Sequence, residues 1–399
     1  MRFHQWMTCL STSMMVASAS FAAQPPAVHQ QIQMPLCLAK HVSPAYPVLA
    51  ENKAYKIIDI PAKDLTKIVL LADKVHCGRF VNVSHQLTGN SLLMQQAAAK
   101  QLLTHAQTKK TVQLSGSYPI EHQTLVFSTI EKVKTENIMA TLTRLTKFQN
   151  RAATLQTGVD AAKWLQSTFN GFAEEYERND TATYFVKTGR YYVQPSLVTV
   201  IGKDIQAPAL VIGAHMDTLE GRMPGAGDDG SGSASIMEMA RVLMSSDIPL
   251  KRPVYFIWYA AEEQGLVGSQ YVVRHFMEKS IPVKAAIQFD MTGFRNDRND
   301  PTMWVYRDYT DNKLSDFVAK LIETYVGVPV AESECGYGCS DHASWMEEGI
   351  PAAFPCETDF PSHNKAIHSD RDTVDRLTPE HMTNFAKLGV AFAIELAAK

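Results

Sequence analysis

Continuous apolar runs alternate with segments whose apolar residues recur at helical spacing from about residue 137 onward. The runs are PSLVTVIG (195–202), PALVIGAHMDT (208–218), RPVYFIWYAAEE (252–263), KAAIQFDMTG (284–293) and IPAAFPCE (350–357). The helical segments are 137–153, 160–172, 231–246, 311–327 and 378–398. Strands that are apolar throughout are buried on both faces, as in sheets covered by helices on each side. The pattern therefore predicts a three-layer α/β/α domain with a mostly parallel central sheet.

The preceding part of the chain, to about residue 125, has a different pattern. It contains amphipathic segments such as 55–75 and 91–107, and its His, Asp and Glu residues form no cluster that we expect to act together. We interpret it as a small separate domain. Two roles fit such a domain. One is a structural extension, and the other is a propeptide that helps folding or blocks a site until it is removed.

The first residues have the organisation of a secretory signal peptide. Arg2 begins a short basic region, a moderately apolar stretch runs from about Met7 to Ala19, and small residues precede Pro25. Cleavage is expected near Ala22 or Ala23, and the alternative is an ordinary N-terminal helix. No other stretch has the ~18 continuous apolar residues that a membrane span needs. We therefore predict a soluble protein that is secreted to the extracellular space through the periplasm.

Composition narrows the class without naming a function. The chain has 399 residues, of which 45% are hydrophobic and 20% charged, as in folded globular proteins. A formal net charge of −3 gives no argument for nucleic acid or an anionic membrane as a partner. Six cysteines are present, and Cys9 would leave with the signal peptide. In an oxidising compartment the others allow the pairs Cys37–Cys77 and Cys335–Cys339, with Cys356 left over. A zinc knot at CGYGC is a weaker alternative, because it lacks a second cysteine pair.

Ionisable side chains follow the apolar runs at the points where strands should end. These are His215 and Asp217, the adjacent pair Glu262 and Glu263, and Asp290; Asp228 and Asp229 precede a helix, and His368 lies in the irregular segment NKAIHSDRDT. The carboxyl ends of parallel strands meet at one edge of a sheet, where ligands bind. We therefore expect these residues to lie together.

Each of these residues also has an ordinary explanation. The histidine could be a hydrogen-bonded core residue, Asp228 or Asp229 could cap a helix, Asp290 could pair with an arginine, and the two glutamates could be solvated. Their joint placement favours a metal site. Imidazole and carboxylate without thiolate suit catalytic zinc. Five ligands exceed what one zinc needs but suit two metals about 3.5–4 Å apart that share a carboxylate.

Six motifs in order resemble those of secreted bacterial leucyl aminopeptidases. They are GAHMDT, AGDDGSG, AAEEQGLVGS, QFDMTG, CGYGCSDHASW and AIHSDRDT, within residues 137–399. Those enzymes are co-catalytic di-zinc peptidases that share the fold of the transferrin-receptor protease-like domain. The resemblance implies a signal peptide at 1–23, a propeptide domain at 24–128 and a catalytic zinc-exopeptidase domain at 129–399. It also implies a zymogen, because such enzymes are often made with an inhibitory or fold-assisting propeptide.

The resemblance also implies roles for particular residues. His215 and Asp290 would bind one Zn²⁺ and Glu263 and His368 the other, with Asp228 bridging them. Asp217 would orient His215. Glu262 would act as general base, taking a proton from the attacking water and delivering it to the leaving amine. Tyr337 would help to stabilise the oxyanion; packing is the ordinary alternative.

The same resemblance implies an apolar pocket for the first side chain of the substrate, with the Cys335–Cys339 disulfide shaping one wall. The implied lining residues are Met291, Tyr306, Phe354, Phe360 and Ile367, each of which could equally be ordinary core. Cys356 and His363 depart from the family, since larger aromatic residues are expected there. A wider or more polar pocket follows from that departure.

We therefore predict a monomeric, secreted zinc aminopeptidase that releases hydrophobic, leucine-type residues from peptide or protein N-termini, with its own propeptide as partner. The alternatives are a di-zinc exopeptidase of other specificity, such as a carboxypeptidase or dipeptidase, a glutaminyl cyclase, and an inactive binding domain. The first usually carries an inserted lid domain, for which the interval from Asp290 to His368 is too short. Glutaminyl cyclases usually hold one zinc, and an inactive domain would be expected to lack several ligands.

Overall fold

A mixed sheet of eight strands organises the larger domain of the computed structural model, in the order β11-β10-β12-β9-β7-β8-β6-β5. The structure describes residues 28–87, 89, 91–105 and 118–399. The strands are β5 (Thr181–Val186), β6 (Ser196–Ile201), β7 (Ala209–His215), β8 (Val254–Tyr259), β9 (Val283–Gln288), β10 (Met303–Tyr306), β11 (Val330–Ser333) and β12 (Ala352–Cys356). The central strands β8, β7, β9 and β12 pair in parallel, and β5, β6 and β10 add antiparallel pairings. The five expected strands are present.

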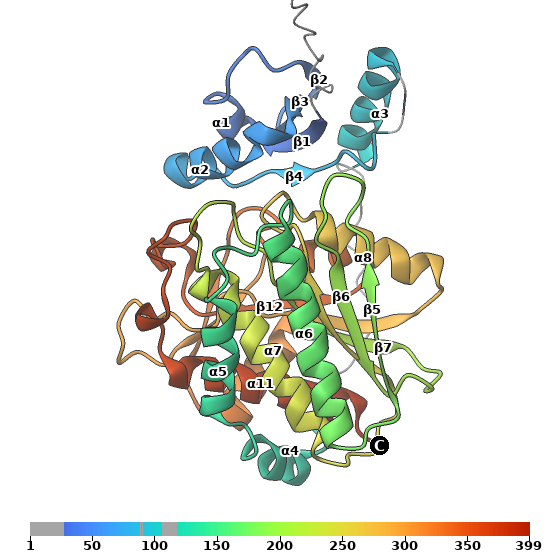
Figure 1. Ribbon diagram of the computed structural model, residues 1–399, viewed down its shortest axis with the longest axis vertical. Coiled ribbons are helices and arrows are strands. Elements are labelled where there is room, and N and C mark those ends of the chain that lie inside the picture. Colours follow the sequence, from blue (N-terminus) through green and yellow to red (C-terminus); the bar gives the residue numbers. More distant parts are fainter. Residues whose placement is uncertain (1–27, 88, 90, 106–117) are drawn as a thin grey trace, which may run out of the picture.

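Helices cover both faces of this sheet, so the predicted three-layer α/β/α fold is confirmed (Figure 1). One face carries α4 (Gln123–Ile130), α5 (Thr135–Leu145), α6 (Gln156–Glu175), α7 (Gly232–Met244), α9 (Asn312–Leu321), which continues into the π-helix η3 (Ile322–Val326), and α11 (Pro379–Ala397). The other face carries α8 (Val267–Glu278) and α10 (His342–Glu347). The side chains of successive strand residues point to opposite faces of the sheet and pack against different helix layers. Ile212 packs with the first group and Val211 with the second.

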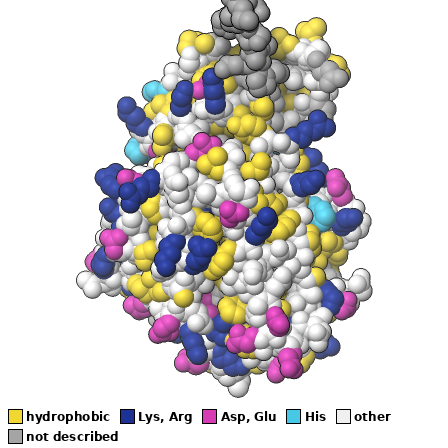
Figure 2. Space-filling model, viewed as in Figure 1, with side chains coloured by type: hydrophobic (Ala, Val, Ile, Leu, Met, Phe, Trp, Pro, Cys, Tyr) yellow, Lys and Arg dark blue, Asp and Glu magenta, His cyan; other side chains and the backbone are white. Residues whose placement is uncertain are grey.

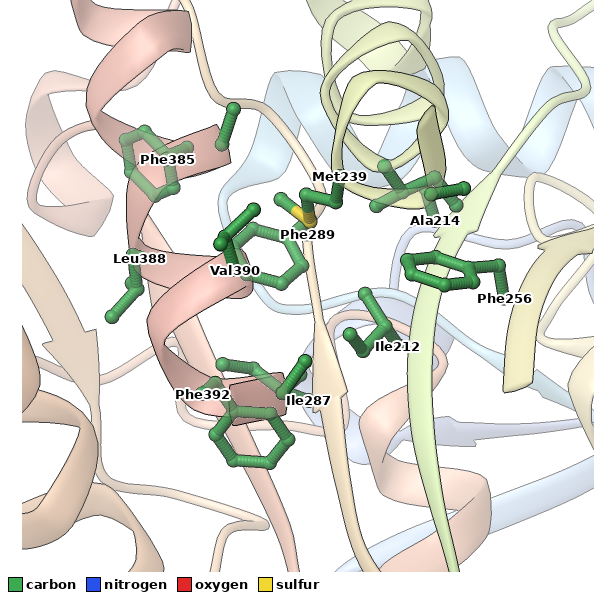
Figure 3. Packing of buried hydrophobic residues seen from close by; sticks show 14 of the residues in the cluster. Ile212, Ala214, Met239, Phe256, Ile287, Phe289, Phe385, Leu388, Val390 and Phe392 are labelled. Atoms are coloured by element: carbon green, nitrogen blue, oxygen red, sulfur yellow. The ribbon is translucent and has the colours of Figure 1, made fainter. Parts of the chain in front are cut away.

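The larger of the two core layers lies between the sheet and the helices α7 and α11. In Figure 3, Met239 of α7 lies beside Phe289, and Phe385 and Phe392 approach the sheet from α11. The two helices come so close that a Cβ at Gly389 would collide with the sulfur of Met239. This dense packing holds the strand ends, and the residues that follow them, in fixed positions.

The N-terminal part forms its own four-stranded sheet, in the order β2-β3-β1-β4. Its elements are β1 (His29–Pro35), α1 (Leu36–Ala39), β2 (Val48–Glu51), β3 (Tyr55–Pro61), the 3₁₀ turn η1 (Ala62–Asp64), α2 (Leu65–Val75), β4 (Val81–Asn82) and α3 (Leu92–His105). A disulfide joins Cys37 to Cys77, as predicted. The amphipathic segment 55–75 is divided between β3, which ends at Pro61, and α2, which begins at Leu65.

The smaller domain sits on the larger one, with α2 and β4 on the side that faces it (Figure 1). Leu219 of the larger domain is buried in the same cluster as Ile68 and Val69 of α2. Polar contacts cross the boundary as well: the N–H of Asn82 donates to the carbonyl of Gly265 at 2.9 Å, and Gln270 Nε2 donates to the carbonyl of Asn82 at 3.1 Å. The interface therefore combines apolar burial with hydrogen bonds that backbone and side-chain groups donate to backbone carbonyls.

Packing brings the start of the larger domain earlier than the expected boundary at residue 128. Val126 and Ile130 of α4 are buried in the main core, and Tyr118 packs against it. Glu395 of α11 accepts the backbone N–H groups of Glu121 and His122. The expected signal peptide, 1–23, lies outside the described residues. Among the described residues, no helix has the length and apolar character to cross a membrane. On the face in Figure 2, basic and acidic side chains are interspersed.

Candidate metal and catalytic site

The ionisable residues singled out in the sequence converge at the carboxyl edge of the large sheet. His215 ends β7, Glu262 and Glu263 follow β8, and Asp290 follows β9. Asp228 lies in the segment η2 (Ala226–Ser231), which leads into α7 and whose backbone departs from helical geometry at Asp228 and Asp229. His368 lies between the 3₁₀ turns η4 (Phe360–Ser362) and η5 (Val374–Arg376). All six side chains are buried, with exposed fractions of 9% or less.

Two groups of donor atoms share the carboxylate of Asp228. One group is His215, Asp228 and Asp290, and the other is Asp228, Glu263 and His368, with ligand atoms within 4.8 Å of one another in each. His215 Nε2 lies 2.9 Å from Asp228 Oδ1 and 3.6 Å from Asp290 Oδ1. His368 Nε2 lies 3.1 Å from Asp228 Oδ2 and 3.0 Å from Glu263 Oε2. Each oxygen of Asp228 thus faces a different histidine.

The donor set fits metal ions better than it fits an internal hydrogen-bond network. His368 Nε2 and Asp290 Oδ1 are buried, yet neither finds a hydrogen-bond partner of acceptable direction among the described residues. Buried polar atoms without partners are costly unless another group binds them. Imidazole nitrogens and carboxylate oxygens, without thiolates, are the donors of catalytic zinc sites. The geometry therefore suits two zinc ions that share Asp228.

The electrostatics of the two histidines lead to the same conclusion. Burial lowers the pKa of His215, but Asp290, Asp217 and Asp228 outweigh burial, and the net pKa lies well above the usual value. The pKa of His368 is likewise raised, against the effect of burial, by Glu263, Asp228 and Asp73. The surrounding carboxylates therefore favour a positive charge at the positions of the two imidazole rings. Metal ions can supply that charge in place of the imidazole protons, since metal binding releases protons from its ligands.

Supporting carboxylates surround the two groups. Asp217 Oδ1 lies 3.5 Å from His215 Nδ1. Asp229 accepts the backbone N–H groups of His215, Gly232 and Met291, so its carboxylate is directed into the fold and not toward the donor atoms. Asp372 accepts the N–H groups of Gly227 and Asp228 at 3.0 Å, which holds the loop of the shared carboxylate. Our sequence reasoning missed Asp372, although it lies in the same motif as His368.

Glu262 differs from its neighbour in its surroundings. Burial raises the pKa of Glu262 well above the usual range; Arg79 and His215 act in the opposite direction, and Asp341 and Glu263 add to the rise. Its side chain lines the cavity beside the two donor groups. Glu263 instead lies 3.0 Å from His368 Nε2. Glu263 alone contacts His368, and the Arg79 guanidinium lies near both glutamates, so positive charge offsets the burial of two adjacent carboxylates.

A cavity of about 100 Å³ adjoins the donor groups and is lined by all five residues expected in the substrate pocket. These are Met291, Tyr306, Phe354, Phe360 and Ile367. Tyr337 also lines the cavity, and its ring meets the ring of Phe360 edge-on with 6.0 Å between centroids. The predicted Cys335–Cys339 disulfide is present. Among the described residues, Cys356 is the cysteine that forms no disulfide. It lines the same cavity, as does His363.

The N-terminal domain also contributes to this cavity, which the sequence did not indicate. Arg79 Nη2 donates to Glu263 Oε2 at 2.8 Å, and Arg79 Nη1 lies 3.9 Å from Glu262 Oε2. Asp73 Oδ2 lies 2.6 Å from His368 Nδ1. At Gly78, with φ of +77°, a Cβ would lie 3.0 Å from the ring of Tyr337, so glycine permits this close approach. Asp73 and Arg79 belong to no motif that could have marked them.

Comparisons with known proteins identify the family of this chain. Residues 197–393 match the model of Peptidase family M28. Leucine aminopeptidase 1 of Coccidioides posadasii is 34% identical over 310 residues, which cover 73% of this chain and 79% of that protein. The crystal structure of the LapA aminopeptidase of Legionella pneumophila is 61% identical, with a TM-score of 0.89, and the match covers 94% of this chain and 99% of that one. That of LapB from the same organism is 42% identical, with a TM-score of 0.87, covering 92% and 99%. Because its buried donor atoms are of the type that binds zinc, and because its relatives are M28 peptidases and aminopeptidases, the chain belongs to peptidase family M28 and is a zinc aminopeptidase.

Proposed function

We propose that the mature enzyme removes hydrophobic, leucine-type residues from peptide N-termini at a site that holds two Zn²⁺ ions. His215 and Asp290 would hold one ion, Glu263 and His368 the other, and Asp228 both. The ions would supply Lewis acidity to the scissile carbonyl and acidify the attacking water. The observation that carries this proposal is the sharing of Asp228 by two buried donor groups beside an apolar cavity.

The chain's own residues would perform the proton transfers. Glu262 takes a proton from the water as its oxygen bonds to the carbonyl carbon, and delivers that proton to the amine nitrogen as the C–N bond breaks. The Tyr337 hydroxyl donates a hydrogen bond to the oxygen that becomes negative. Burial raises the pKa of this hydroxyl, so it keeps its proton at neutral pH. These roles require both side chains at the cavity wall, which is where they lie.

Release from the N-terminus follows from charge and shape. The free α-ammonium of a substrate is a cation, and buried carboxylates stand at the end of the apolar cavity. Arg79 already places a cation against Glu263, so this position favours positive charge. A substrate with its ammonium there and its first side chain among Met291, Phe354 and Ile367 presents its first peptide bond to Glu262. This arrangement favours an aminopeptidase over a carboxypeptidase.

We infer further that the N-terminal domain, which lies within the expected propeptide 24–128 and precedes Tyr118, blocks this site in a secreted zymogen. Arg79 occupies the position proposed for the substrate ammonium, and Gly78 lies against Tyr337. Both disulfides fit an oxidising compartment. The expected signal peptide at 1–23 supports export. A peptide cannot place its N-terminus beside Glu263 while the Arg79 guanidinium is bound there.

The test is the initial rate of leucine p-nitroanilide hydrolysis, measured with added zinc before and after a protease cuts the chain between His105 and Tyr118. We expect the cut chain to gain activity, and the cut Glu262→Gln variant to lose about 10²-fold or more with unchanged zinc content. Glu348→Gln, an exposed position, is the matched control. A cut chain that binds two zinc ions but hydrolyses no aminoacyl amide would refute the aminopeptidase assignment of the site.

A further inference from the structure

The two histidines of the candidate site have carboxylates on both sides of their rings. Each Nε2 faces the shared Asp228. The Nδ1 of His215 faces Asp217, two residues along the same chain segment, at 3.5 Å. The Nδ1 of His368 faces Asp73 at 2.6 Å, and Asp73 belongs to the N-terminal domain. A histidine that binds a metal through one nitrogen usually donates the hydrogen of the other to such an acceptor, which fixes its tautomer and orientation.

From this arrangement we propose that Asp73 is a positioning residue for the metal site, so that the N-terminal domain completes the site that it also covers. This inference rests on the proposed function, because it needs His368 to be a metal ligand. Asp73 holds the Nδ1 hydrogen and leaves the Nε2 lone pair free toward Glu263 and Asp228. Among the described residues, the hydrogen-bond partner of His368 Nδ1 is the carboxylate of Asp73.

The position of Asp73 is held firmly from its own domain. It lies in the last turn of α2, whose buried residues Ile68 and Val69 pack in one cluster with Leu219 of the catalytic domain. Two residues beyond the end of α2, Cys77 is tied to Cys37 by a disulfide. The helix end cannot shift without disturbing both contacts. The carboxylate is therefore presented to His368 by a supported element and not by a free loop.

His368 lies in a loop, so its position depends more on side-chain contacts than that of His215, which ends a strand. His368 has φ of 55°, in the left-handed region that residues other than glycine rarely adopt. Its ring is held by tertiary contacts and not by a regular helix or strand, because it lies between η4 and η5. Of the two histidines, His215 ends a strand in the middle of the sheet. Loss of one acceptor should therefore affect His368 more than loss of a comparable contact would affect a strand residue.

Asp73 and Arg79 then act on the site in opposite directions, although they belong to one segment. Arg79 places a cation against Glu263, and competes with any cation bound there. Asp73 orients His368 and favours metal binding. Removal of Asp73 should weaken the metal bound by Glu263 and His368, and should leave the ion held by His215 and Asp290 unchanged.

The experiment measures zinc binding by the full-length chain, using competition with a chromogenic chelator. Wild type is compared with Asp73→Ala and with Asp64→Ala, a control in the same domain whose carboxylate pairs with Lys67. We expect Asp73→Ala to raise one of two zinc dissociation constants about tenfold or more, the other remaining unchanged. Equal constants in all three chains would overturn the proposal. Wild type that binds fewer than two zinc ions would instead refute the proposed di-zinc site, and this inference with it.

A second measurement separates positioning from a general structural role. The unfolding temperature of each full-length chain is recorded without metal and with saturating zinc, since a ligand stabilises by its affinity for the folded state. For Asp73→Ala we expect a smaller zinc-induced rise than for wild type, and an intermediate rise for Asp73→Asn, which keeps an acceptor oxygen without the charge. A lower temperature without metal, combined with an unchanged zinc-induced rise, would show that Asp73 supports the fold alone and would overturn the proposal.

Discussion

Asp217 accepts the backbone N–H of Glu262 at 3.0 Å, which links the end of β7 to the turn after β8. Its other oxygen accepts the N–H of Glu263 at 3.3 Å. The same carboxylate lies 3.5 Å from His215 Nδ1. One buried side chain therefore sets the positions of a proposed ligand of each metal and of the proposed base. It does so from outside both donor groups.

This arrangement predicts that Asp217→Asn weakens zinc binding even though Asp217 is not a proposed ligand. The amide keeps one acceptor oxygen, but it turns an NH₂ group toward a backbone N–H and removes the charge that faces His215. We expect zinc affinity and kcat each to fall by about 10- to 100-fold. Zinc titration and kinetics of the cut chain check this. Asp204→Asn, whose side chain is 81% exposed, should match wild type in both.

Removal of the Arg79 guanidinium should release activity from the uncut chain. Arg79→Ala frees Glu263 from its 2.8 Å contact and opens the position proposed for the substrate ammonium. We expect the variant to hydrolyse leucine p-nitroanilide at least tenfold faster than uncut wild type, while the two are equal after cutting. Lys67→Ala, in the same domain, is the control and should remain blocked. A silent uncut Arg79→Ala chain would show that other contacts are sufficient for the block.

Acidic pH should loosen the N-terminal domain through His85. Burial, with a contribution from Arg274, lowers the pKa of His85 to about 4. His85 lies at the domain interface, with its ring centroid 5.5 Å from that of Tyr271 in α8. A histidine freed from this interface has a pKa near 6.5, so between those pKa values the open state binds more protons than the closed state. The stabilisation is present above about pH 6.5 and is lost as the pH falls toward 4. The loss is at most about 3 kcal/mol.

This prediction is tested by thermal unfolding of the full-length chain between pH 7.5 and pH 4.5, measured in parallel for wild type and the His85→Gln variant. Glutamine cannot take up a proton, so the stability of the variant should fall less over this range. Buried His342 and His381, whose pKa values are lowered to about 3 and about 4, remain in both chains and cancel in the comparison. Parallel curves would contradict a role for His85.

The thiol of Cys356 should set how large a first residue the enzyme accepts. It lines the cavity of about 100 Å³ with Phe354 and Met291. Cys356→Leu places a larger side chain in that space, so kcat/KM for leucine amides should fall about tenfold relative to alanine amides. Cys356→Ala, which removes the sulfur, should leave the preference for leucine in place. An unchanged ratio in the leucine variant would place the first side chain of the substrate elsewhere.

The residues of the candidate site could be singled out from the sequence because of how each strand ends. His215, Glu263 and Asp290 follow apolar runs, and parallel strands bring their carboxyl ends to one edge. The short strands β10 and β11 and the edge strand β5 were not anticipated. β5 and β11 are partly exposed and lack the continuous apolar runs that mark strands buried on both faces, whereas β10, with the sequence MWVY, is almost fully buried but only four residues long.

The sequence by itself therefore determined the three-layer fold and the set of candidate ligands, because local hydrophobic pattern and residue order specify where strands end, and it allowed the two disulfide pairs that the structure contains. Tertiary structure alone decided that Asp73 meets His368 across 295 positions and that Arg79 meets Glu263 across 184. No local pattern encodes those contacts, because they depend on how two parts of the chain, each with its own sheet, pack together. The buried interface between α2 and the catalytic domain brings the carboxylate of Asp73 and the guanidinium of Arg79 into the site, although no motif marks the segment that carries them.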